Sequence, residues 1–110
     1  MCGIAGVIET SSANSTISLD LLKSMSDVIV HRGPDSDGQW VSENRHCGLS
    51  FRRLAIIDLS PLGNQPMHSN DGRYTIVFNG EIYNHQEIRN ELQKLGYKYK
   101  SGTDTETILN

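Results

Sequence analysis

The order of apolar and polar positions divides the first third of the chain into a strand, a loop and a helix. Gly3–Glu9 is a short apolar run with two glycines, which predicts a buried strand closely approached by another element. The polar segment Thr10–Thr16 is expected to be a loop. Within Ile17–Val30 the apolar residues recur on one helix face behind the candidate N-cap Ser18, and a Gly-Pro pair in His31–Asp35 predicts a tight loop after this helix.

Short apolar runs alternate with turn residues in the middle of the chain. Gln39–Ser42 and Cys47–Phe51 are predicted to be two strands joined by a polar turn, and Leu54–Leu59 is a third strand-like run. Pro61–Met67 is expected to be a loop. Tyr74–Phe78 is rich in β-branched and aromatic residues and follows an Asp-Gly pair, which is typical of a hairpin turn. A strand is therefore predicted to end just before an Asn-Gly-Glu sequence.

Two helix starts are predicted near the end of the chain. Asn84–Glu87 resembles a capping box, and apolar residues at helical spacing follow it as far as Gly96. Tyr97–Lys100 has the pattern of a short strand. Thr103–Glu106 is a second capping box, and its helix is cut short by the end of the chain. We therefore expect residues 1–110 to be the N-terminal part of a larger domain.

Composition and charge narrow the classes of function. Ten Lys and Arg against thirteen Asp and Glu give the 110 residues a net charge of -3, which disfavours binding to nucleic acid phosphates. No apolar run approaches the ~18 residues of a membrane span, so a cytoplasmic protein without membrane contact is predicted. Two cysteines are too few for a disulfide scaffold, and the four histidines lack the spacing of a metal site.

Cys2 is the first candidate for catalysis. Removal of the initiator Met would leave Cys2 with both a thiol and a free α-amine, whose ordinary pKa is about 7.7 to 8.0. That amine could accept the thiol proton near neutral pH, so one residue would supply nucleophile and base. The alternative is that Cys2 is only a small apolar residue that leads into the first strand.

Further candidates lie at the ends of the predicted strands and at the last helix. The Asn79 amide and the Gly80 backbone N–H could form an oxyanion hole, although Asn-Gly is also a common turn. Arg53 or its neighbour Arg52 could bind a carboxylate, and strand alternation puts only one of them on a given face. Asp104 could bind an ammonium group or merely stabilise a helix N-terminus. An arginine and an aspartate in one site would bind the carboxylate and the ammonium of an α-amino acid.

Five short motifs, in this order, resemble the glutaminase domain of class II glutamine amidotransferases. Within that group they are most similar to glutamine-hydrolysing asparagine synthetases, as indicated by Pro-Asp after His-Arg-Gly and by Leu after the candidate arginine. The resemblance covers essentially the whole chain. The motifs are Met1–Gly6, His31–Asp35, Arg53–Asp58, Asn79–Asn84 and Thr103–Glu106.

The resemblance implies a role for each matching residue. Cys2 would attack the side-chain amide of L-glutamine, release ammonia and form a glutamyl thioester that water hydrolyses. Asn79 and Gly80 would form the oxyanion hole. Arg53 would bind the α-carboxylate of glutamine, and Glu81 with Asp104 would bind its α-ammonium. Leu54 through Ile57 would line the glutamine site, and Asn79 and Gly80 would also contact the substrate.

The implied fold is α+β, the four-layer αββα sandwich of N-terminal-nucleophile hydrolases, of which this chain would be the N-terminal portion. No cofactor is implied for glutamine hydrolysis. ATP and Mg²⁺ would serve a synthetase domain outside residues 1–110, which would use the ammonia to make asparagine from aspartate. The implied partners are L-glutamine, that domain and a second copy of the chain. Two alternatives stay open: an amidotransferase with another acyl-adenylate acceptor, and a catalytically silent interaction domain.

Overall fold

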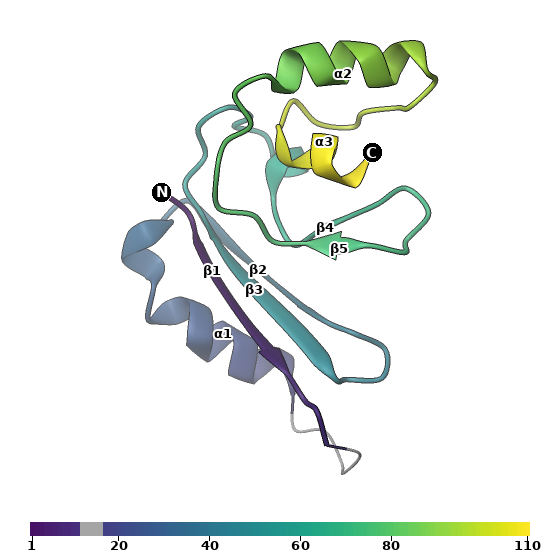
Figure 1. The fold of residues 1–110 in the computed structure, drawn as a ribbon. Helices are drawn as coiled ribbons and strands as arrows, with labels where there is room; N and C mark the ends of the chain where they lie inside the picture. The colour runs from purple at the N-terminus through teal and green to yellow at the C-terminus, as the bar shows by residue number, and fades with distance from the viewer. Residues whose placement is uncertain (12–16) are drawn as a thin grey trace.

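A computed structural model describes residues 1–11 and 17–110 of the chain (Figure 1). Most of the predicted loop Thr10–Thr16 lies outside these described residues. The described parts combine α-helices with antiparallel strands, so the fold class is α+β. Within them, no helix is long and apolar enough to cross a membrane.

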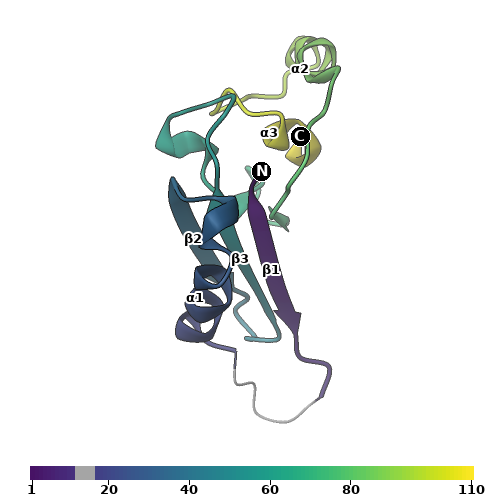
Figure 2. The same ribbon diagram turned by 90° about the vertical axis from the view of Figure 1, so that its left-hand side faces the viewer.

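A three-stranded antiparallel sheet forms the base of the molecule. Its strands are β1 (Gly3–Ile8), β2 (Ser36–Val41) and β3 (Cys47–Arg53), in the order β1-β3-β2. The turn that joins β2 to β3 is the predicted one, and Arg45 within it has a φ of 59°. The helix α1 (Leu19–Asp27) covers one face of this sheet (Figures 1 and 2).

Close packing of α1 against β3 forms the apolar core. Ile17 and Leu22 are almost fully buried, and a Cβ added to Gly48 of β3 would lie 2.8 to 3.0 Å from their side chains. The Ser50 hydroxyl, on the same face of β3, donates to the Leu22 carbonyl at 3.0 Å. The strand therefore presents small side chains where the helix approaches most closely.

The start of α1 is as predicted, but its end is not. The Ser18 hydroxyl accepts a hydrogen bond from the Leu21 N–H at 3.1 Å, which confirms the N-cap. The helix ends at Asp27 instead of Val30, because the Ile29 N–H bonds to the Ser26 carbonyl at 3.1 Å and tightens the last turn. A 3-10 turn, η1 (Val30–Arg32), then leads back to the sheet.

The rest of the chain lies at the end of the sheet where β1 begins and β3 ends (Figures 1 and 2). It contains the 3-10 turn η2 (Pro61–Gly63), the hairpin β4 (Met67–His68) with β5 (Thr75–Ile76), and the helices α2 (His85–Lys94) and α3 (Thr105–Leu109). The predicted Asp-Gly turn is present, with a φ of 73° at Gly72. The His68 ring lies 6.2 Å from the Trp40 ring, so β4 contacts β2 on the sheet face opposite α1.

Three strand predictions are wrong in whole or in part. Leu54–Leu59 and Tyr97–Lys100 contain no strand, and Tyr74–Phe78 contributes only its residues 75 and 76 to β5. In each run a backbone N–H bonds to a side chain outside the run and not to a neighbouring strand. These bonds join Ala55 to Asp35 at 2.8 Å, Phe78 to Gln65 at 2.6 Å and Lys100 to Glu106 at 2.7 Å.

Neither predicted capping box forms, although both helices exist close to their predicted places. Asn84 is the N-cap residue of α2 but makes no side-chain capping bond. The N-cap of α3 is Asp104, not Thr103. The buried Glu106 carboxylate instead accepts bonds from the backbone of Lys100 and Ser101, because these loop N–H groups have no strand partner.

Gly33 offers a test of how the loop before β2 packs on β3. A Cβ at Gly33 would lie 2.4 Å from the backbone of Arg52, which cannot move aside as a side chain can. We expect Gly33→Ala to lower the free energy of unfolding by about 1–3 kcal/mol in urea titrations of the full-length protein. Gly6→Ala is the matched control, because its closest neighbour would be a flexible Leu49 methyl at 3.3 Å. Equal effects of the two substitutions would contradict this packing.

Candidate active site

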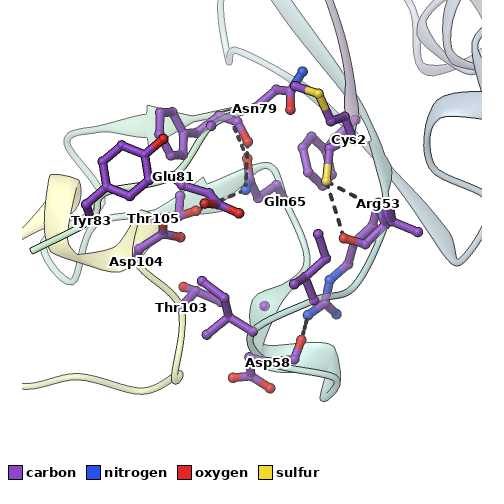
Figure 3. Close-up of a pocket in the computed structure, with 18 residues that line it drawn as sticks. Cys2, Arg53, Asp58, Gln65, Asn79, Glu81, Tyr83, Thr103, Asp104 and Thr105 are labelled. Carbon is purple, nitrogen blue, oxygen red and sulfur yellow. Dashed lines mark hydrogen bonds between the residues drawn. The ribbon is translucent and has the colours of Figure 1, made fainter. Parts of the chain in front are cut away.

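A pocket of about 390 Å³ lies where the sheet meets the second half of the chain (Figure 3). Its wall comes from the start of β1, the end of β3 and the following loop, the segment after β5, and the start of α3. All eight residues that the sequence predicts for catalysis or glutamine binding line it, namely Cys2, Arg53, Leu54, Ile57, Asn79, Gly80, Glu81 and Asp104. Their proximity is observed, and their chemical roles stay predictions.

Cys2 is half-buried at the entrance to β1, and its sulfur lies against the backbone of Leu54. The Leu54 N–H donates to Sγ at 3.3 Å, and the thiol is 3.5 Å from the Leu54 carbonyl oxygen. The Arg32 guanidinium donates to the Cys2 carbonyl at 3.2 Å. These contacts hold the thiol on the pocket wall, at the point where β1 begins and β3 ends.

The register of β3 separates the two neighbouring arginines. Arg52 lies on the α1 face, where it donates to the Gly33 carbonyl at 2.9 Å and lies 3.7 Å from the Asp37 carboxylate. Arg53 lies on the opposite face and lines the pocket. Only Arg53 is therefore placed to meet a ligand in this pocket.

Neutral oxygen atoms hold the Arg53 guanidinium, which is buried to 7% exposure. Nη1 donates to the Ser60 carbonyl at 2.6 Å and to the Asn64 side chain at 2.8 Å, and Nη2 bonds to the Asp58 carbonyl. Among the described residues no carboxylate forms an ion pair with it. Its position is thus set while its positive charge stays available to a carboxylate ligand.

Asp104 is a buried carboxylate, 5% exposed, at the other side of the site. Its Oδ2 accepts a bond from the Ile82 N–H at 2.9 Å, and it makes no capping bond to α3. Asp104 is nevertheless the N-cap residue of α3, so its position also agrees with the alternative that its charge favours the helix N-terminus. Glu81, which is exposed, extends into the same pocket (Figure 3).

Asn79 and Gly80 follow Phe78 in a segment without regular secondary structure. Neither residue has a positive φ, so the pair is not a tight hairpin turn. A Cβ at Gly80 would lie 2.8 Å from the Phe78 ring. The Gly80 backbone thus lies close to the Phe78 ring, which also lines the pocket.

Comparison with known proteins places this arrangement in a family. A family model described as a glutamine amidotransferase domain matches residues 1–110. The chain belongs to the glutamine amidotransferase domain family. This agrees with the resemblance drawn from the five motifs.

Similar curated proteins include enzymes named for asparagine synthesis. The chain is 47% identical to asparagine synthetase [glutamine-hydrolyzing] 1 of Bacillus subtilis over 110 residues, and 40% identical to the Asparagus officinalis enzyme over 108. It is 37% identical to amidase chry2 of Gibberella zeae over 117 residues. These matches cover 98 to 99% of this chain but only 17% of each relative.

Ten of the eighteen residues that line the pocket were not predicted as site residues from the sequence, among them Asp58 and Gln65. Asp58 was quoted only as part of a motif, and Gln65 lies in a segment predicted to be a plain loop. No pattern around Gln65 signals its burial to 7% exposure, because its partners are far along the chain. In the described part of the chain, no cluster of three or more His, Cys, Asp or Glu side chains could hold a metal ion.

Asp58 joins the loop that holds Arg53 to the segment that precedes Asp104. Its carboxylate accepts bonds from the Ser60 N–H and the Gly102 N–H, each at 2.8 Å. A hydrogen bond from the Ser60 side chain, together with these two backbone bonds and the Arg53 charge, lowers the pKa of Asp58 from 3.8 to about 2. The folded protein therefore favours the ionised carboxylate more strongly than the unfolded chain does.

This pKa shift predicts a pH-dependent difference between the wild type and Asp58→Asn. The stabilisation is complete above the unfolded pKa near 3.8 and is lost as the pH falls toward about 2, because the unfolded state binds the proton first. Urea midpoints of the two proteins should differ at neutral pH and converge across that window. A difference that stays constant down to the lower pH would contradict this role.

Proposed function

We propose that this chain carries the glutamine-hydrolysing site of an amidotransferase that supplies ammonia for ATP-dependent asparagine synthesis. One observation carries the proposal: a single pocket holds a thiol, a buried carboxylate and a guanidinium that forms no ion pair with any described residue. These groups match the side-chain amide, the α-carboxylate and the α-ammonium of glutamine. The names of the relatives in Bacillus and Asparagus support asparagine synthesis as the use of the ammonia.

In the proposed reaction, the Cys2 sulfur attacks the side-chain amide carbon of glutamine. The α-amine of Cys2, exposed once Met1 is removed, takes the thiol proton and later protonates the departing nitrogen. The carbon–sulfur bond forms, the carbon–nitrogen bond breaks and ammonia leaves. Water then attacks the thioester and releases glutamate and the thiol.

The oxyanion of each tetrahedral intermediate would be stabilised by two donors, the Asn79 side-chain amide and the Gly80 N–H. One such donor contributes about 3–4 kcal/mol to the transition state in other acyl-transfer enzymes. Both belong to the segment after Phe78, which crosses the pocket between Cys2 and α3 (Figure 3). Their placement relative to the thiol is therefore central to the rate.

The other end of glutamine would be held by opposite charges. Arg53 would bind the α-carboxylate, and Asp104 with Glu81 would bind the α-ammonium, while Leu54 and Ile57 form the walls. Binding both charges at once selects an α-amino acid over a simple amide. No cofactor takes part in this half of the reaction, and ATP with Mg²⁺ would act in a synthetase domain outside this chain.

We further propose that the complete domain is the four-layer αββα sandwich of N-terminal-nucleophile hydrolases. The sheet face opposite α1 leaves Ile4 and Ile8 at 47% and 73% exposure, as expected where a second sheet would pack. A cytoplasmic location is proposed because Cys2 and Cys47 are both free thiols, which persist in a reducing compartment. The proposed partners are the synthetase domain and a second copy of the chain.

A different ammonia acceptor is the second candidate function. It is favoured by one observation, the 37% identity to a protein named amidase chry2, whose name does not mention asparagine. Mass spectrometry of the product formed from glutamine, ATP and aspartate decides between the two. Asparagine supports the first proposal, and unchanged aspartate supports the second. The silent-domain alternative fits less well, because such a domain has no need for all these groups in one pocket.

Replacing the nucleophile tests the reaction itself. Cys2→Ala in the full-length protein should lower glutamine-dependent ammonia release by more than about 10³-fold, because no other group in the pocket can form the thioester. Product formation from added ammonium salt should continue, which shows that the variant is folded. Ammonia release at the wild-type rate would rule out Cys2 as the nucleophile.

A further inference from the structure

Gln65 is a buried polar side chain on the pocket wall that the proposed reaction leaves without a role. It is 7% exposed and lies between η2 and β4. A buried carboxamide is costly unless its donors and acceptor are paired. The identity of its partners therefore indicates what this side chain does.

The carboxamide of Gln65 pairs with both backbone groups of Phe78. Its Oε1 accepts from the Phe78 N–H at 2.6 Å, and its Nε2 donates to the Phe78 carbonyl at 3.3 Å. This is how a residue on a neighbouring antiparallel strand would pair. Because β5 already ends at Ile76, the side chain takes the place of the missing strand.

The same carboxamide also reaches α3. Nε2 donates to the Thr105 hydroxyl at 3.2 Å, so both of its hydrogens are used (Figure 3). Phe78 immediately precedes Asn79 and Gly80, and Thr105 immediately follows Asp104. One side chain thus joins the segment with the proposed oxyanion donors to the helix start with the proposed ammonium acceptor.

The backbone of Gln65 is itself held against the sheet. A Cβ added to Gly38 of β2 would lie 2.1 Å from the Gln65 carbonyl oxygen and 3.2 Å from Pro66. Since β2 pairs directly with the strand that carries Arg53, the sheet supports the guanidinium and the Gln65 backbone together. The carboxamide therefore links a rigid base to two segments that lack strand partners.

We propose that Gln65 is a positioning residue that sets the placement of Asn79 and Gly80 relative to Asp104. This inference rests on the proposed function, since it assigns those residues their roles toward glutamine. Gln65 does not itself bind the substrate, because both of its donor hydrogens are committed within the chain. An error of about 1 Å in such a placement can cost about 10²-fold in rate.

Gln65→Met is the main test, because it keeps the length of the side chain and removes all three hydrogen bonds. In the full-length protein it should lower kcat for glutamine hydrolysis by about 10- to 100-fold. KM should change much less, since the guanidinium that binds the α-carboxylate is untouched. Synthesis from added ammonium salt should be retained. The matched control is Gln93→Met on the exposed surface of α2, which should leave kcat unchanged.

Substitutions of Thr105 distinguish the hydrogen bond from Gln65 to α3 from its hydrogen bonds to Phe78. Thr105→Val removes only the bond from Nε2 to the Thr105 hydroxyl and should give a smaller fall in kcat than Gln65→Met. Thr105→Ser keeps the hydroxyl and should recover most of that loss. A purely structural role would not produce this ordered effect on kcat with ammonia-dependent synthesis intact. An unchanged kcat in Gln65→Met would overturn the proposal.

Hydrogen exchange tests whether Gln65 holds the two segments even if the wild type does not hydrolyse glutamine. That result would refute the proposed function, but the link between the two segments could still be measured. Backbone amides within 77–82 and 103–107 should then exchange faster in Gln65→Met than in the wild type and the Gln93→Met control. Equal exchange in all three proteins would show that Gln65 does not hold these segments.

Discussion

The pocket depends on hydrogen bonds between side chains and the backbone of the surrounding loops. Backbone N–H groups removed from water need acceptors, and several of those described around this site have no partner in a strand or helix. Asp58, Gln65 and Glu106 supply acceptors instead, each accepting from two backbone N–H groups or pairing with both groups of one residue. The loops between the sheet and α3 therefore have one defined arrangement, and the proposed catalytic groups lie on those loops.

The pleat of β3 supplies the second constraint. Successive side chains on a strand point to opposite faces, so Arg52 packs on the α1 side while Arg53 reaches the pocket. A shift of one residue would exchange the two arginines and move Phe51, which is 1% exposed, to the wrong side. The close approach of α1 at Gly48 opposes such a shift, so packing on one face fixes the chemistry on the other.

Local patterns predict those parts of the fold that depend on near neighbours. The Ser18 cap, the turn at Gly72 and the pairing of β2 with β3 all involve residues close in sequence, although β2 begins at Ser36 and not at the predicted Gln39. Leu54–Leu59 was predicted wrongly because its apolar pattern resembles a strand, whereas its backbone bonds to Asp35 and to the Cys2 sulfur. Those partners lie 20 and 52 residues away, and periodicity cannot report them.

What the sequence predicts of the candidate site also depends on how far apart the interacting residues lie in the chain. The eight predicted site residues could be predicted as a set from the resemblance to a family, and they do share one pocket. The choice of Arg53 over Arg52 follows from strand register once the pocket face is known. Gln65 could not be predicted, because its partners Phe78 and Thr105 lie 13 and 40 residues away.

The most direct test of the account is the intact mass of the full-length protein, quenched in acid during turnover of glutamine. We expect a protein without Met1 that carries one added glutamyl group, mapped by peptide analysis to Cys2 and absent from Cys2→Ala. A wild-type protein that releases ammonia from glutamine with no trace of this adduct, or with the adduct at Cys47, would contradict it.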